Sequence, residues 1–96
     1  MQYNVYDLGS GALVVDVQTD FLDTGTRIVA PLILAKNAPP PIPRLKPQFE
    51  LANHTYVLHP QELAAVPTAA LQMPLADLSL YRDEITRALD IVFHGF

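Results

Sequence analysis

The order of the hydrophobic patterns along the chain limits its fold more than any other feature of the sequence. Alternating polar and apolar residues, typical of strands, occur early, over 2–7 and 12–18. A helical stripe appears only near the end, over 79–94, and is formed by Tyr81, Ile85, Ala88, Leu89 and Val92. Strands first and one helix last predict an α+β domain, mainly antiparallel sheet with a C-terminal α-helix. The 96 residues are expected to form a single domain over 1–96.

The predicted C-terminal helix carries signals at both of its ends. Ser79 or Asp77 is expected to cap its N-terminus, because a short polar side chain there accepts a hydrogen bond from a free backbone N–H. Gly95 stands where a helix commonly ends in a positive φ angle. These signals place the helix over 79–94.

Two further strands are predicted with a proline inside each. The segment from Arg27 to Leu34 is apolar almost throughout, which is typical of a strand covered on both faces. Proline cannot donate a ladder hydrogen bond, so Pro31 is expected at a bulge or an edge position. The same constraint applies to Pro67 in a strand predicted over 66–72.

A second hairpin and a proline-rich stretch occupy the middle of the chain. Strands are predicted over 48–51 and 55–59, joined by Ala52-Asn53-His54, in which asparagine tolerates a left-handed backbone. Residues 37–47 hold five prolines and are expected to run extended, either as a stiff surface loop or as a recognition loop.

The shortage of charge suggests that another chain covers part of the surface. Only 17% of the residues are charged, against about 25% in an ordinary soluble domain. From Leu51 to Ala76 the only Asp, Glu, Lys or Arg is Glu62. Obligate homodimer interfaces are apolar, so the stretch 63–76 is expected to contribute to a two-fold interface between two copies.

Composition also excludes several kinds of partner and site. Six basic residues against ten acidic ones give a net charge of −4, which leaves no basic footprint for nucleic acid or an anionic membrane. The absence of cysteine excludes disulfides and thiolate metal sites. No targeting or membrane-spanning segment is apparent, so a cytoplasmic protein is expected.

The polar residues do not suggest an active site. His54 and His59 lie on opposite faces of a regular strand and are expected at the surface or in the hairpin, not on a metal. Asp16 interrupts a strand and is expected to face water or to bond a neighbouring turn. Ser10 and Ser79 lack a nucleophile elbow. No catalytic residue, metal or cofactor is predicted.

Large apolar residues stand at two unusual places. Phe21 and Leu22 lie in a predicted loop over 19–26. The chain ends in Phe93-His94-Gly95-Phe96, although terminal residues are usually polar unless they dock onto something. For Phe93, packing within the protein or its dimer mate and packing on a partner remain equally open. Phe96 favours a partner.

These residues also carry a family resemblance. The run Val15-Asp16-Val17-Gln18-Thr19-Asp20, the Phe21-Leu22 pair that follows it and the Phe93-x-Gly95 ending resemble the CcdB plasmid-addiction toxins. The similarity runs from residue 1 to 96 and thins at 9–11 and 36–48.

The resemblance implies a homodimeric toxin of a type II toxin–antitoxin pair. Its fold would be the SH3-like barrel of the CcdB and MazF toxins, with a C-terminal helix. Such a toxin binds the A subunit of DNA gyrase and traps the enzyme on cleaved DNA. It would not be an enzyme, would use no cofactor, would not bind nucleic acid directly, and would be neutralised by a CcdA-like antitoxin.

The resemblance also assigns target-contacting positions. They are Phe21, Leu22, Asp90, Val92, Phe93, His94, Gly95 and Phe96. His94 departs from the family, whose best-known toxins have tryptophan there, a better partner for a stacked cation. A CcdB-like protein with weakened toxicity or another protein target is therefore an alternative. A MazF-like endoribonuclease, with Arg27 as its basic residue, is a lesser one.

Overall fold

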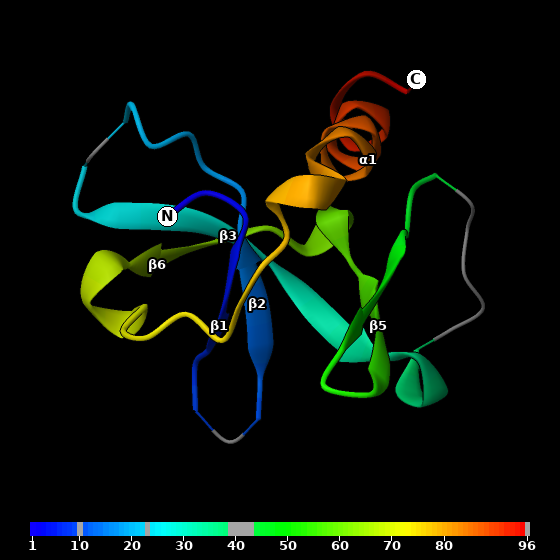
Figure 1. Cartoon of the computed structure of the whole chain (residues 1–96). Helices are drawn as coiled ribbons and strands as arrows, with labels where there is room; N and C mark the ends of the chain where they lie inside the picture. The colour runs from blue at the N-terminus through cyan, green and yellow to red at the C-terminus, as the bar shows by residue number, and fades with distance from the viewer. Residues whose placement is uncertain (10, 23, 39–43, 96) are drawn as a thin grey trace.

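One long strand organises the whole sheet. The computed structural model describes residues 1–9, 11–22, 24–38 and 44–95. Strand β3 (Thr26–Leu34) pairs along one edge with β2 (Leu13–Asp16). Along its other edge it pairs with two strands in succession, as Figure 1 shows.

The remaining strands extend the sheet on both sides of β3. On one side β2 pairs with β1 (Asn4–Asp7), and β1 pairs with the short β7 (Ala76–Asp77). On the other side β3 pairs with β6 (Ala64–Pro67) and with β5 (His54–Leu58), and β5 pairs with β4 (Gln48–Leu51). All these pairings are antiparallel, and the sheet curls into a nearly closed barrel with one C-terminal helix. The predicted α+β, SH3-like barrel is confirmed.

Pro31 lies where β3 changes partner. Thr26–Val29 pair with β6, whereas Leu32–Leu34 pair with β5. The Pro31 carbonyl accepts a hydrogen bond from the His59 N–H at 3.0 Å. The N–H and C=O of one strand residue face the same edge, so the missing N–H lies at this junction and no bond to β2 is lost. The predicted bulge or edge position is wrong, because β3 is interior and its register with β2 is continuous.

The strand predicted over 66–72 ends early. Strand β6 stops at Pro67, which pairs with Thr26, the first residue of β3. Beyond it Thr68–Ala70 form a 3₁₀ turn, and the Thr68 N–H reaches the Gly25 carbonyl at 3.0 Å. The strand prediction fails there because β3 offers no further partner residues.

The second hairpin has a tighter turn than expected. Leu51 pairs with His54, so only Ala52 and Asn53 lie between the strands. Their φ angles are 51° and 65°, the two positive values of a type I′ turn. In the proline-rich segment that precedes this hairpin, residues 39–43 lie outside the described residues.

Helix α1 (Arg82–His94) begins later than predicted. Ser79–Tyr81 form a 3₁₀ turn before it, and the Ser79 N–H donates to Asp77 Oδ1 at 2.8 Å. Asp77 therefore bonds the first residue of that turn, and α1 itself has Tyr81 at its N-cap and no capping side chain in the described ranges, so the predicted cap by Ser79 or Asp77 is wrong for the helix. The C-terminal prediction is confirmed, since Gly95 has a φ of 80° and its N–H bonds to the Ile91 carbonyl.

The main core joins the barrel to the helix. Helix α1 contributes Ile85 and Ala88, which are fully buried. The other buried residues of this cluster come from the sheet and its connections: Val5, Val15, Ala30, Leu32, Phe49, Leu58 and Leu78. Apolar burial of this kind is the main force that seats a short helix. None of the helices in the described ranges is long and apolar enough to cross a membrane.

Candidate binding surface

The target-contacting positions fall in two separate segments. Phe21 and Leu22 lie in the connection between β2 and β3, and the others lie at the end of α1. Figure 1 shows that connection at the upper left and the end of α1 at the upper right of the barrel. One copy of the chain therefore does not join them into a single patch.

Phe21 and Leu22 present their side chains to water. Phe21 is 101% exposed, as open as in an extended peptide, and Leu22 is 52% exposed. Large apolar side chains left in water are more informative than buried ones, because exposed apolar patches often mark a surface that another molecule covers. The prediction that this loop offers apolar surface is confirmed by these values.

A buried ion pair lies at the base of this loop. Arg27 Nε donates to Asp16 Oδ2 at 2.8 Å, and Arg27 Nη2 donates to Asp16 Oδ1 at 3.2 Å. The same Nη2 also donates to the Gln18 carbonyl and to Asp20 Oδ1. Asp16 is completely buried and does not face water. Its Oδ1 accepts the Gln18 N–H of the adjoining turn, so the second of the two predicted outcomes, a bond to a neighbouring turn, is confirmed.

Gln18 bonds to both ends of the loop. Its side-chain Nε2 donates to the Leu22 carbonyl at 2.7 Å, and its Oε1 accepts the Ile28 N–H at 3.0 Å. The Gln18 side chain is almost entirely buried. Sequence reasoning missed this role and that of Arg27. The only signal was two polar residues, Asp16 and Gln18, at the end of an apolar strand.

The start of the chain reinforces the same cluster. The Met1 amino group donates to Tyr6 Oη at 2.8 Å and to Asp16 Oδ2 at 3.2 Å. The Gln2 N–H donates to Asp20 Oδ1, and this bond, together with Arg27, lowers the pKa of the Asp20 carboxyl. The hydrogen bond to Asp16 is the largest influence that raises the pKa of Arg27. These shifts favour the charged forms of Asp20 and Arg27.

The end of α1 forms the second exposed segment. Phe93 is 62% exposed, and Asp90, His94 and Gly95 are exposed as well. Val92 is half-buried. Phe96 lies outside the described residues. The exposure of Phe93 excludes packing into the core of its own chain.

The two strand histidines have different surroundings. Both were predicted at the surface or in the hairpin; His54 is exposed, whereas His59 is 3% exposed and directly follows the hairpin strand β5, so the surface alternative is wrong for His59. It is buried because it directly precedes Pro60–Glu62, a 3₁₀ turn that contacts both β3 and α1. Among the residues that the structure describes, none bonds His59 Nε2. Burial lowers the pKa of His59, and the nearby Lys46 charge lowers it further.

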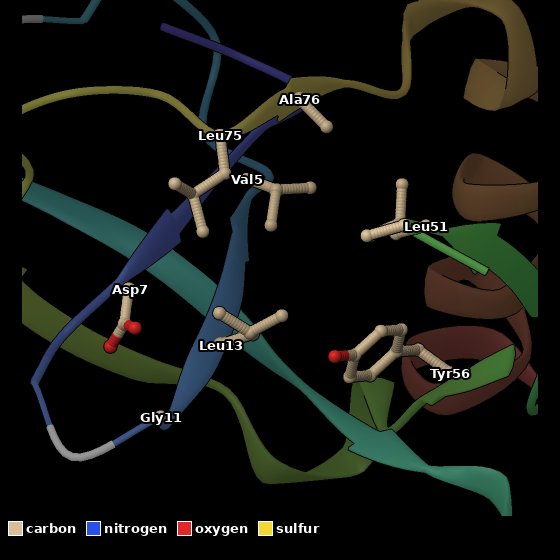
Figure 2. A pocket seen from close by; sticks show the side chains of 9 residues that line it. Val5, Asp7, Gly11, Leu13, Leu51, Tyr56, Leu75 and Ala76 are labelled. Carbon is tan, nitrogen blue, oxygen red and sulfur yellow. The ribbon is translucent and has the colours of Figure 1, made fainter. Parts of the chain in front are cut away.

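An open apolar cavity lies on another part of the barrel. It measures about 300 Å³, and Figure 2 shows side chains of β1, β2 and the β4–β5 hairpin around it. Its lining consists of Val5, Asp7, Gly11, Leu13, Leu51, Ala52, Tyr56, Leu75 and Ala76. Of the predicted target-contacting residues that the structure describes, none lines it. Among its described lining residues Asp7 alone is charged, so they include no pair of catalytic groups. Within the described ranges there is also no cluster of three or more potential metal ligands.

Comparison of the chain with models of known protein families identifies its family. A family model described as CcdB protein matches residues 2–95. The chain belongs to the CcdB family. It is thus a toxin of the toxin–antitoxin class, and the resemblance of its sequence to the CcdB toxins is confirmed as family membership.

A solved structure of another protein shows a similar fold. It is described as an endoribonuclease in complex with its cognate antitoxin from Mycobacterial species. The likeness has a TM-score of 0.78 at 17% sequence identity, and it covers 97% of this chain and 93% of that one. At this identity the comparison supports the barrel of this CcdB-family chain and does not transfer the activity.

The charge-poor stretch of this CcdB-family chain leaves apolar side chains uncovered. Met73 is 79% exposed and Leu75 is 60% exposed. Leu80, just beyond the stretch, is 91% exposed. The apolar residues of 63–76 that are not in the core thus form surface, as expected of an interface with another chain.

Proposed function

We propose that this CcdB-family protein binds the A subunit of DNA gyrase and holds the enzyme on cleaved DNA, so that double-strand breaks persist. The observation that carries the proposal is the complete exposure of Phe21 beside Leu22, at the positions where the family resemblance puts the gyrase contact. A protein with this role acts in the cytoplasm, where the chromosome is, and works by binding alone.

The physical basis is an apolar anchor offered in two places. Large, rigid side chains that become buried at an interface commonly supply most of its binding energy. Phe21 and Leu22 form one anchor, and Phe93 at the end of α1 forms the other. Asp90 adds negative charge beside the second anchor, which favours a basic target surface.

We infer that the protein acts as a homodimer. The exposed Met73 and Leu75 support this arrangement, because obligate interfaces are apolar. Light scattering at micromolar concentration is expected to give twice the mass of the chain. A monomer at that concentration would contradict the inference. A CcdA-like antitoxin that wraps the dimer is the further partner proposed.

The surroundings of Arg27 argue against the endoribonuclease alternative. A ribonuclease needs an accessible cation to stabilise the charge that develops on the phosphate. Arg27 is buried and bonded to Asp16, Asp20 and the Gln18 carbonyl, so its charge is already compensated. The protein is expected to leave single-stranded RNA intact. Reproducible cleavage at defined sites would favour the alternative.

A DNA-cleavage assay tests the gyrase proposal. The protein is incubated with gyrase from its own host, ATP and supercoiled plasmid, and the products are treated with SDS and protease. Linear DNA is expected with the wild type and much less with Leu22→Ala. Leu8→Ala removes an exposed leucine from the β1–β2 turn and should behave like the wild type. No linear DNA with the wild type would refute the proposal.

His94 favours a second version, in which the toxin is weak. The residue is exposed at the last helical position, where the family's best-known toxins have tryptophan. Indole stacks on a cation better than imidazole does, by an amount on the order of 1 kcal/mol, or five- to tenfold in affinity. His94→Trp is therefore expected to strengthen gyrase binding. A variant that inhibits growth where the wild type does not would identify the native chain as a weakened toxin.

A further inference from the structure

The loop with Phe21 and Leu22 gains little order from its large apolar side chains. Phe21 is fully exposed, and Leu22 is half-exposed. Within the loop, the Thr19 hydroxyl accepts the Phe21 N–H and the Thr19 carbonyl accepts the Leu22 N–H, both at 3.3 Å. A loop with so few apolar contacts would be expected to sample many conformations. Its order has to come from groups at its base.

We propose that Gln18, together with the Asp16–Arg27 ion pair, forms a positioning device that holds the loop in its target-binding shape before the target arrives. The proposal rests on the function proposed above. The three side chains do not face the target, because all are buried. They act through the two exposed residues that the loop carries.

Gln18 is the part of the device that spans the loop. Its Nε2 bonds to the carbonyl of Leu22 and its Oε1 bonds to the N–H of Ile28, which lies in β3. One side chain thus joins the exposed tip of the loop to the rigid sheet. The bonds are made away from water, where a hydrogen bond is electrostatically stronger and an unmade one is costly.

Arg27 is the part that fixes where the loop leaves β2. Its guanidinium bonds to Asp16 at the end of β2, to the Gln18 carbonyl and to the Asp20 carboxylate. The three acceptors belong to residues 16, 18 and 20, which is every second residue of this part of the chain. A planar guanidinium with a fixed set of donors imposes one geometry on all three.

Such an arrangement helps binding by lowering the cost of ordering. A loop that is ordered before binding does not lose that conformational freedom on the target. The binding free energy includes the entropy that the loop loses when it becomes ordered on the target. Loss of the device should therefore weaken binding, although no atom that contacts the target is removed. This property separates positioning residues from contact residues.

Gln18→Met tests the device, with Gln48→Met as the matched control. Methionine has a similar size and makes neither hydrogen bond, whereas Gln48 is exposed on β4. The first readout is hydrogen exchange at the Phe21 and Leu22 amides, which does not require gyrase. Exchange is expected to accelerate on the order of tenfold in Gln18→Met and to stay unchanged in Gln48→Met. Equal exchange in the two variants would overturn the proposal.

The second readout is a double-mutant cycle on the affinity for the gyrase A subunit, by calorimetry. Gln18→Met alone is expected to weaken binding on the order of tenfold. In a Phe21→Ala background the same change should cost less than about threefold, because the anchor it positions is gone. An equal loss in both backgrounds would overturn the positioning role. Failure of the wild type to bind would refute the proposed function and leave the exchange result as the test of the device.

Asp20→Ala covers the case in which Gln18→Met does not fold. Asp20 is half-exposed, and its removal deletes one of the three acceptors of Arg27 while the buried Asp16–Arg27 pair stays. Exchange at the Phe21 and Leu22 amides is again expected to accelerate. Unchanged exchange in this variant would count against the device as well.

Discussion

The two exposed segments are held in place by different forces. The β2–β3 connection is fixed by a few buried polar groups, chiefly Asp16, Gln18 and Arg27. The end of α1 is fixed by regular helical hydrogen bonds and by an apolar seat, in which Ile85 and Ala88 are buried. Polar contacts are directional and depend on one another, whereas apolar packing tolerates small adjustments. The β2–β3 connection should therefore be the more easily disrupted of the two segments.

The largest expected effect is a loss of stability when the ion pair under the β2–β3 connection is broken. Arg27→Met leaves the Asp16 carboxylate buried without its main partner. Removing one partner of a buried ion pair commonly costs about 3–5 kcal/mol of stability. Arg82→Met, at the exposed start of α1, is the control and should change the free energy of unfolding by less than about 0.5 kcal/mol. Urea denaturation measures both.

A double variant gives a stricter form of that test. Replacing both partners, Asp16→Val with Arg27→Met, removes the unpaired charge and should recover most of the lost stability. Equal stability of Arg27→Met and Arg82→Met would contradict a structural role for the ion pair. A double variant no more stable than the single one would point to a packing role of the arginine.

The next largest effect is a loss of affinity when an exposed phenylalanine is removed from either segment. Phe21→Ala and Phe93→Ala each remove an exposed anchor, so each should leave the melting temperature nearly unchanged. Each should weaken binding to the gyrase A subunit by about 2 kcal/mol, or roughly 30-fold, if both act as interface hot spots. Calorimetric titration of the two variants measures this. A loss confined to Phe93→Ala would mean that the target contacts only the tail.

A third effect is a pH-dependent loss of stability close to the helix. His59 lies next to the turn that contacts α1, and burial together with Lys46 lowers its pKa in the folded state. The unfolded chain, with a histidine pKa of about 6.5, takes up a proton first as the pH falls. Stability contributed by neutral His59 is therefore complete above about pH 6.5 and declines as the pH falls below it.

Thermal unfolding between pH 7.5 and 5 measures that decline. His59→Met should flatten the pH dependence over this range, whereas His54→Met, at an exposed position, should leave it as in the wild type. The carboxylate of Glu62, 4.0 Å from His59 Nδ1, opposes the effect without reversing it. An identical slope in wild type and His59→Met would exclude this residue as its source.

The smallest effect concerns a turn that belongs to neither segment. Ala52 has a φ of 51°, which costs an L-residue with a side chain about 1–2 kcal/mol. Ala52→Gly relieves this strain but adds freedom to the unfolded chain, for a net gain of about 0.5 kcal/mol. Ala12→Gly, in the other hairpin, lacks the strain and should destabilise slightly. A loss of stability in Ala52→Gly would contradict the type I′ assignment.

The features predicted correctly from the sequence are those that depend on local pattern. The helical stripe around Ile85 and Ala88 and the stop at Gly95 follow from spacing and from one residue type. The exposed pair Phe21 and Leu22 follows from apolar residues in a loop. Each requires only neighbouring residues.

The features that were missed depend on the register between distant strands. Asp16 lies opposite Val29, and Arg27 is two residues from Val29 and so faces the same side of the sheet. No local pattern reveals that contact, so the sequence predicts for Asp16 only water or a neighbouring turn as its partner and not Arg27. His59 was misplaced for a similar reason, since its burial depends on a turn that packs on both β3 and α1.

The pairing of β3 has a consequence for the rate of folding. Its N-terminal half is completed by β6 and its C-terminal half by β5, although β5 lies closer along the chain. Barrel closure must therefore wait for contacts between residues far apart in sequence, and folds dominated by such contacts form slowly. During synthesis, the N-terminal half of this edge of β3 remains unpaired until β6 has emerged. An open strand edge can pair with another chain, and Pro31, which has no N–H to donate, lies next to this open half.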